Sequence, residues 1–102
     1  MILVRHEIGE VLRDFRQQKG HTLRQVASRA SVALGYLSEV ERGQKEASSE
    51  ILASVAEALD VPISTVMREV GDRIAVVEGL HTFPDVVPAD LVASVDAELS
   101  LR

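Results

Sequence analysis

The 102-residue sequence contains no cysteine and no tryptophan, and only three of its residues are aromatic, two phenylalanines and one tyrosine. The absence of cysteine excludes disulfides and thiolate metal sites. No apolar run approaches the roughly 20 residues of a membrane-spanning helix, and no basic segment followed by an apolar one indicates secretion. We therefore expect a cytoplasmic protein without membrane association, bound metal or cofactor.

The apolar residues that are present predict an all-α domain. Hydrophobic residues make up 46% of the chain. Because so few are aromatic, the core must be built from Leu, Val, Ile and Ala, which suits closely packed helices. Helical spacing predicts a first helix over about residues 5–18, a fourth after the N-cap Ser48 and a fifth from Pro62. At this length we expect one domain with a tail.

Between Thr22 and Gly43 the sequence predicts two short helices joined by a tight turn. The first has apolar residues at i, i+3, i+4 and i+7, namely Leu23, Val26, Ala27 and Ala30. Thr22 is a suitable N-cap for it, and Gln25 completes a capping box. Small residues at about 31–33 form the turn, and Gly43 ends the second helix as a C′ glycine. This layout is typical of a helix-turn-helix, whose second helix enters the DNA major groove.

The same region resembles a known family. The runs Ala27-Ser-Arg-Ala-Ser-Val32 and Leu37-Ser-Glu-Val-Glu-Arg-Gly43 are similar to the Cro/phage-repressor (xenobiotic response element) family of DNA-binding domains, a resemblance that extends over about residues 8–70. A longer run from Leu34 to Glu50 resembles, more narrowly, the actinobacterial regulators of Clp protease genes. The family resemblance implies a five-helix helix-turn-helix domain. It also implies a buried ion pair that joins the first helix to the third, formed by Arg16 and Glu41.

The resemblance further implies which residues face the bases. These positions are Ala33, Leu34, Gly35, Ser38 and Glu39. Ala33 and Leu34 cannot hydrogen-bond a base, so we expect them to pack against a thymine methyl group. Gly35 permits close approach of the backbone to DNA, and the other two supply polar groups. For Glu39 the alternative is a solvated helix charge without a role in binding.

A second set of residues is expected to contact the phosphate backbone or the groove edge. Its members are Arg24, Gln25, Tyr36, Arg42, Gln44, Lys45, Ser48 and Ser49. Arg24 and Gln25 lie at the start of the first helix of the motif, where backbone N–H groups can also meet a phosphate. The alternative for Arg42 is a surface salt bridge to a nearby glutamate, and for Tyr36 a purely structural place in the core.

The charge of the chain is unevenly distributed. The net charge is −5, yet residues 1–46 hold eight Lys/Arg against six Asp/Glu, whereas residues 47–102 hold three against ten. A mildly basic half with an acidic half is typical of a sequence-specific DNA binder, although the acidic half could serve solubility alone. Because few phosphates can be neutralised, we do not expect strong non-specific DNA affinity.

After a DNA-binding domain at residues 5–70, Gly71 is expected to start a different region, residues 71–102, in which Gly79, Pro84 and Pro88 break the chain. A final helix is expected near residues 88–99. The apolar residues assigned to a dimer interface are Ile74, Val77, Leu91, Val92, Val95 and Leu99. Folding back onto its own domain is the alternative. We favour pairing with a second subunit, because helix-turn-helix proteins usually bind two half-sites as two-fold dimers.

These features predict a homodimeric, sequence-specific transcription regulator that binds double-stranded DNA. The resemblance to Clp gene regulators favours an activator of Clp protease and stress genes, and an activator implies RNA polymerase as a further partner. The alternatives are a repressor or antitoxin of the same fold, and a protein-interaction module without DNA binding. An enzyme is not expected, because His6, His21 and His81 lack metal-ligand spacing and no glycine-rich phosphate loop is present.

Overall fold

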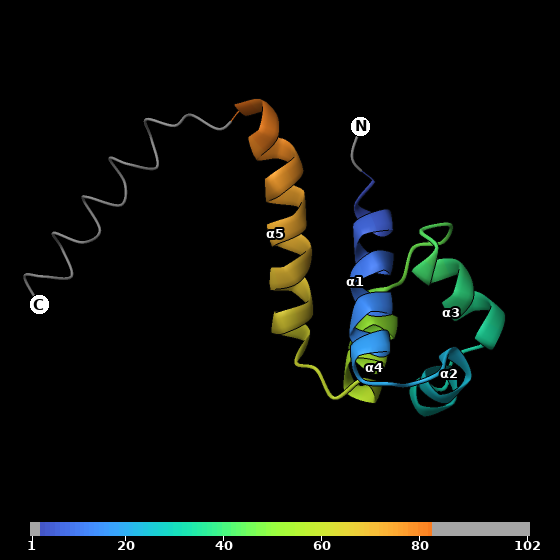
Figure 1. The fold of residues 1–102 in the computed structure, drawn as a ribbon. Coiled ribbons are helices and arrows are strands. Elements are labelled where there is room, and N and C mark those ends of the chain that lie inside the picture. Colours follow the sequence, from blue (N-terminus) through green and yellow to red (C-terminus); the bar gives the residue numbers. More distant parts are fainter. Residues whose placement is uncertain (1–2, 83–102) are drawn as a thin grey trace, which may run out of the picture.

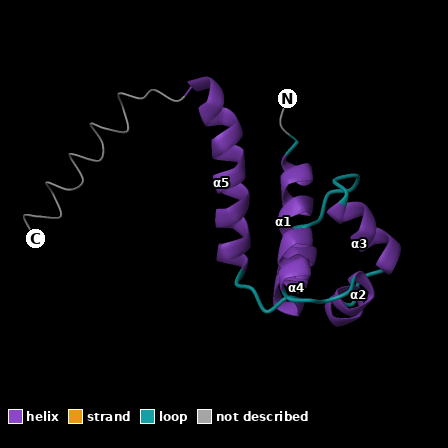
Figure 2. Cartoon of the chain, viewed as in Figure 1, coloured by secondary structure: helices purple, strands orange, loops and turns teal. Residues whose placement is uncertain are grey.

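The computed structural model describes residues 3–82, and this part of the chain forms five α-helices without a strand (Figures 1 and 2). The helices are α1 (Val4–Gln18), α2 (Leu23–Ala30), α3 (Leu34–Glu41), α4 (Ser49–Ala58) and α5 (Ile63–Thr82). The predicted all-α fold is confirmed. None of the described helices is both long and apolar enough to cross a lipid bilayer. The predicted helix near residues 88–99, with Leu91, Val92, Val95 and Leu99, lies outside the described residues.

Two helix starts agree with the sequence prediction. At α2 the Thr22 hydroxyl accepts a hydrogen bond from the backbone N–H of Gln25 at 3.1 Å, and the Gln25 side-chain oxygen accepts one from the N–H of Thr22 at 2.8 Å. This is the predicted capping box, which satisfies two N–H groups that have no partner inside the helix. At α4 the Ser48 hydroxyl accepts from the N–H of Ile51 at 3.2 Å.

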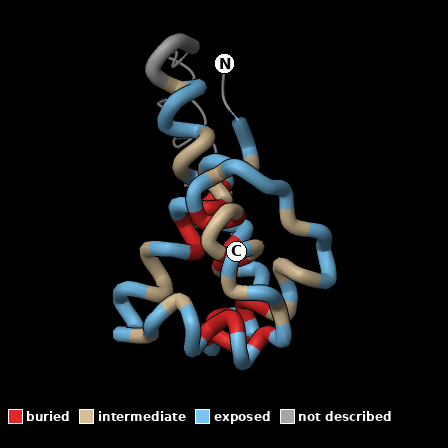
Figure 3. The backbone as a smooth tube through the Cα atoms, turned by 90° about the vertical axis from the view of Figure 1, so that its right-hand side faces the viewer, coloured by how far each residue is buried: buried red, intermediate tan, exposed pale blue. Residues whose placement is uncertain are grey.

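The core consists of aliphatic side chains from all five helices, as the low aromatic content predicted. Figure 3 shows the buried segments gathered where the helices meet. The largest fully buried side chains are Leu12, Leu37, Leu59, Val11, Val26, Val40, Val55 and Val66. Phe15 and Tyr36 pack against this cluster but are only partly buried. The short helices of the motif are therefore held by a bundle that α1, α4 and α5 complete.

Gly71, where the sequence predicts the start of a different region, lies inside α5, which continues through that residue as one helix of 20 residues. Gly71 has no positive φ, and a Cβ built on it would meet no atom within 4 Å. The glycine therefore costs helix propensity of about 1 kcal/mol relative to alanine but does not end the helix.

Contacts with α1 explain why α5 continues. Arg73 donates a hydrogen bond to Asp14 of α1 at 2.7 Å and another to Glu69, one turn earlier on α5, at 3.2 Å. Ile74 packs against the core of its own chain. This contact differs from the dimer contact that the sequence analysis assigned to Ile74, since the side chain is partly covered within the monomer.

Candidate nucleic-acid interface

The turn between α2 and α3 has the tightness that a helix-turn-helix requires. Ser31 follows α2 in the left-handed region of the backbone, with φ of 58°. The N–H of Val32 donates to the carbonyl of Ala27 at 3.0 Å, which closes the C-terminus of α2. α3 then begins one residue after Ala33. A left-handed serine carries no sequence signal as clear as that of glycine, so this conformation was not predicted.

α3 divides into an inward and an outward side. Leu37, Val40 and Glu41 are buried, whereas Ala33 and Gly35 are exposed. Ser38 and Glu39 are half-buried. Leu34 is also half-buried and packs partly against the core, so less of its side chain is available to a base than predicted. No side chain caps the N-terminus of α3. The outward side is thus small and mostly uncharged, which allows a close approach to another surface.

Tyr36 and Arg42 differ in the contacts that their side chains make with other residues of the chain. The Tyr36 hydroxyl donates a hydrogen bond to the backbone carbonyl of Glu46 at 2.8 Å, and its ring packs partly against the core. This contact favours the structural alternative for Tyr36. Arg42 is exposed and forms no ion pair with any residue between 3 and 82, so the alternative to its predicted DNA contact, a salt bridge to Glu39 or Glu46, is not observed there.

The predicted phosphate contacts lie in the segments that precede and follow α3. Their side chains are exposed: Arg24, Gln25, Gln44, Lys45, Ser48 and Ser49. Two of them already serve as caps, since the Gln25 side-chain oxygen accepts from Thr22 and the Ser48 hydroxyl accepts from Ile51. The Gln25 amide group still has N–H donors that the capping box does not use. These six residues stay a predicted phosphate-binding set.

The C-terminal turn of α3 packs closely against the backbone of α1. A Cβ built on Gly9 would lie 2.3 Å from the carbonyl oxygen of Val40 and 2.6 Å from that of Glu41, so no larger residue fits without a backbone shift. The close contact at Gly9 was not among the features predicted from the sequence. A glycine inside an otherwise regular helical pattern is the signal that could have indicated such a close contact.

A buried ion pair fixes the same helices further along α1. Arg16 donates from Nε to Glu41 Oε2 at 2.8 Å and from Nη2 to Oε1 at 3.0 Å, a bidentate arrangement. Its Nη1 donates to the carbonyl of His21 at 3.1 Å. The Glu41 side chain is 7% exposed. The hydrogen bond to Glu41 raises the pKa of Arg16, against an opposing effect of burial. This is the contact that the family resemblance implied.

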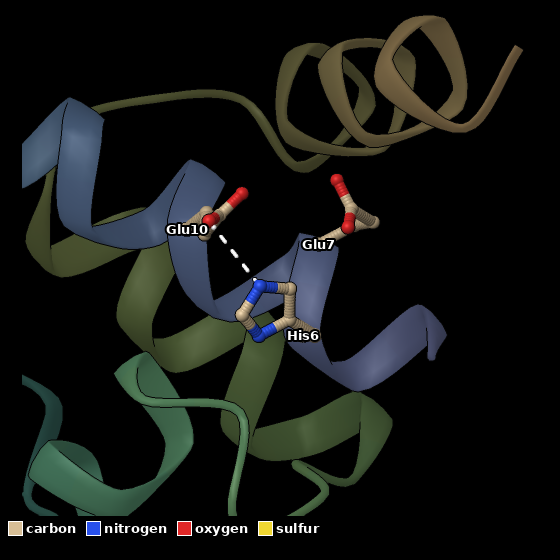
Figure 4. A group of neighbouring side chains, drawn as sticks. All are labelled: His6, Glu7 and Glu10. Carbon is tan, nitrogen blue, oxygen red and sulfur yellow. Dashed lines mark ion pairs between the residues drawn. The ribbon is translucent and has the colours of Figure 1, made fainter. Parts of the chain in front are cut away.

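One group of side chains at the start of α1 has the chemistry of metal ligands. His6, Glu7 and Glu10 each place a ligand atom within 4.8 Å of the others (Figure 4). Spacing among the three histidines does not indicate this group, because two of its members are glutamates on the same helix turn. The His6 and Glu10 side chains are about half exposed and lie 3.3 Å apart as an i, i+4 pair. Because such surface pairs are common, we assign no metal to them.

Known proteins share this arrangement. The sequence profile of the helix-turn-helix family matches residues 12–66. The transcriptional regulator ClgR of Mycobacterium tuberculosis is 52% identical over 73 residues, which are 72% of this chain and 65% of that protein. The transcriptional regulator SinR of Bacillus subtilis is 38% identical over 63 residues, covering 61% of this chain and 57% of that protein.

A solved structure agrees with the profile. The crystal structure of the clp gene regulator ClgR from Corynebacterium glutamicum superposes with a TM-score of 0.70 at 48% identity, covering 74% of this chain and 97% of that chain. The fold of that structure and the profile match over α2, α3 and their turn lead to one conclusion. The chain belongs to the helix-turn-helix family of DNA-binding transcriptional regulators.

Proposed function

We propose that this protein is a sequence-specific transcription regulator that binds a two-fold DNA site as a homodimer and activates Clp protease and stress genes. The observation that carries the proposal is α3, whose outward side is small and exposed while its inner side is fixed to α1 by Gly9 and the Arg16–Glu41 pair. A helix held this firmly can enter a major groove without rearrangement. Similarity to the clp gene regulator ClgR supports Clp genes as targets.

Two observations support the dimer. In the sequence, Leu91, Val95 and Leu99 are apolar at helical spacing. On α5, Val76 is 63% exposed and Met67 43% exposed. Apolar side chains that are exposed to solvent in the monomer are suited to pack against a second subunit.

The test is a selection of binding sites from random-sequence DNA with the full chain, at about 50–100 mM salt, where specific binders hold. We expect an enriched palindrome. Two substitutions then separate base contacts from phosphate contacts. Gly35→Ala should weaken binding to the selected site without lowering stability, because a Cβ there meets no atom of the protein within 4 Å. Arg24→Gln should reduce the salt slope by about 0.9.

Arg68→Gln is the matched control, because Arg68 is an exposed arginine on α5, outside the motif. It should leave both the affinity and the salt slope unchanged. A selection that enriches no palindrome would show that the regulator proposal is wrong and favour a protein-interaction module. Transcription with purified RNA polymerase from a promoter carrying the site then decides between activation and repression, with a rise in transcript expected.

A further inference from the structure

The loop that links α3 to α4, residues 43–47, is held by polar contacts at both of its ends. Arg5 of α1 donates from Nε to the backbone carbonyl of Gly43 at 3.0 Å, and its Nη1 lies 3.7 Å from a carboxylate oxygen of Glu46. Tyr36 of α3 donates from its hydroxyl to the carbonyl of Glu46 at 2.8 Å. Two helices therefore fix one short loop through three contacts.

The loop packs against the core through Ala47, and next to that contact it borders a hollow. A hollow of about 190 Å³ lies between the loop and the start of α1, and both apolar and charged residues line it: Val4, Ile8, Val40, Ala47, Arg5, Lys45 and Glu46. Gln44, Lys45 and Glu46 are exposed. Side chains that face a hollow have no partner atoms on that side and gain no dispersion energy there. Ala47 is thus the contact of the loop with the core, while polar contacts to Gly43 and Glu46 hold the part that carries Gln44 and Lys45.

The first turn of α1 also touches the loop where it leaves α3. Gly43 has φ of +74°, and a Cβ built on it would lie 2.9 Å from both Cα and Nδ1 of His6. The N–H groups of Gly43 and Gln44 donate back to the last turn of α3 at 3.0 and 2.9 Å. The carbonyl of Gly43 is thus left for Arg5, which makes Arg5 the link between α1 and the point where the loop begins.

We propose that Arg5 is a positioning residue for DNA binding: it holds the loop 43–47 so that Gln44 and Lys45 are placed in advance to meet the phosphate backbone. This inference rests on the proposed DNA-binding function. The planar guanidinium donates from Nε to the Gly43 carbonyl while its Nη1 lies beside the Glu46 carboxylate, a fixed arrangement that a lysine ammonium at this position does not reproduce. A loop ordered before binding loses less freedom on association, so affinity rises without a new contact to DNA.

The experiment is a double-mutant cycle on the full chain, with the dissociation constant for the selected DNA site as the readout. Arg5→Ala is expected to weaken binding about 3- to 10-fold, and Lys45→Ala also weakens it. In the Lys45→Ala background, Arg5→Ala should have little further effect, because both changes act on one loop contact. Arg5→Lys keeps the charge but not the geometry, so it should resemble Arg5→Ala.

Hydrogen exchange of the loop amides without DNA provides an independent readout. We expect residues 44–47 to exchange faster in both Arg5 variants, while the amides of α4 are unchanged. Tyr36→Phe removes only the hydroxyl that anchors the other end, and it should show the same non-additivity with Lys45→Ala. It serves as the second variant if Arg5→Ala lowers the melting temperature enough to disturb binding.

Three results would overturn the inference. Additive effects of Arg5→Ala and Lys45→Ala, or wild-type affinity in Arg5→Lys, would show that Arg5 contacts phosphate directly. Unchanged affinity in Arg5→Ala would show that the loop needs no anchor. If the wild-type chain selects no DNA site at all, the proposed function fails and this inference with it, which is a different outcome from an additive cycle on a chain that does bind.

Discussion

At the residue scale, Glu41 is the side chain on which the fold depends most. It is the charged residue buried within residues 3–82, and both of its carboxylate oxygens accept from Arg16. A buried ion pair is weak evidence for net stability, but removing one partner leaves the other charge without compensation. The pair therefore fixes the position of α3 relative to α1, and its importance for stability lies in the cost of losing one partner.

Glu41→Ala is expected to lower the free energy of unfolding by about 3–5 kcal/mol, a large share of the roughly 5–15 kcal/mol typical of small domains. Urea unfolding followed by circular dichroism measures it. Glu10→Ala is the control, because Glu10 pairs with His6 at the surface, where an ion pair contributes about 0–1 kcal/mol. A melting temperature within a few degrees of wild type for Glu41→Ala would contradict the role of the pair.

The direction of the Arg16 pKa shift fixes how this difference varies with pH. A group with a raised pKa contributes stability that is complete below its unfolded pKa and is lost only as the pH rises through the folded value. The pKa of Arg16 is raised above an ordinary value that is already strongly alkaline. The contribution from Arg16 should therefore be constant between about pH 6 and 9.

At the element scale, the sequence predicted where helices begin and end better than it predicted that α5 continues through Gly71. Thr22, Ser48 and Gly43 mark ends through local hydrogen bonds or a positive φ, which depend on neighbouring residues alone. The continuation of α5 through Gly71 depends on a contact between Arg73 and Asp14, 59 residues apart in the chain. The packing of α3 against Gly9 is likewise a contact between segments that are distant in the sequence. No local pattern carries such information, so these features required the structure.

Two glycines inside helices test this distinction, because the same substitution should have opposite effects. Gly9→Ala should lower the free energy of unfolding by about 1–3 kcal/mol, since the new methyl group meets the backbone of α3. Gly71→Ala should raise it by about 0.5–1 kcal/mol, since the methyl group meets nothing and the helix gains propensity. Urea unfolding of both variants provides the comparison. Stabilisation by both would mean that α1 and α3 do not approach as closely as described.

At the scale of the whole molecule, α1 is the element that unites the domain. It seats α3 on one side and binds α5 through the Arg73–Asp14 pair on the other (Figure 1). If α5 contacts a second subunit, as proposed, that contact lies one helix away from α3, the helix proposed to face DNA. The side chains on the outward side of α3 are small, so one copy offers few specific contacts, and the proposed two-fold site would double them.

The last prediction concerns where two copies of the chain pair, in the tail or on α5. If the tail pairs, the full chain should sediment as a dimer, and Val95→Asp with Leu99→Asp should give monomers that bind the palindrome far more weakly. Val76→Asp on α5 is the comparison, because that side chain is 63% exposed in the monomer. A tail variant that stays dimeric, beside a monomeric Val76→Asp, would move the interface to α5. Two half-sites about 34–36 Å apart would then have to be reached by the rigid five-helix body without the tail.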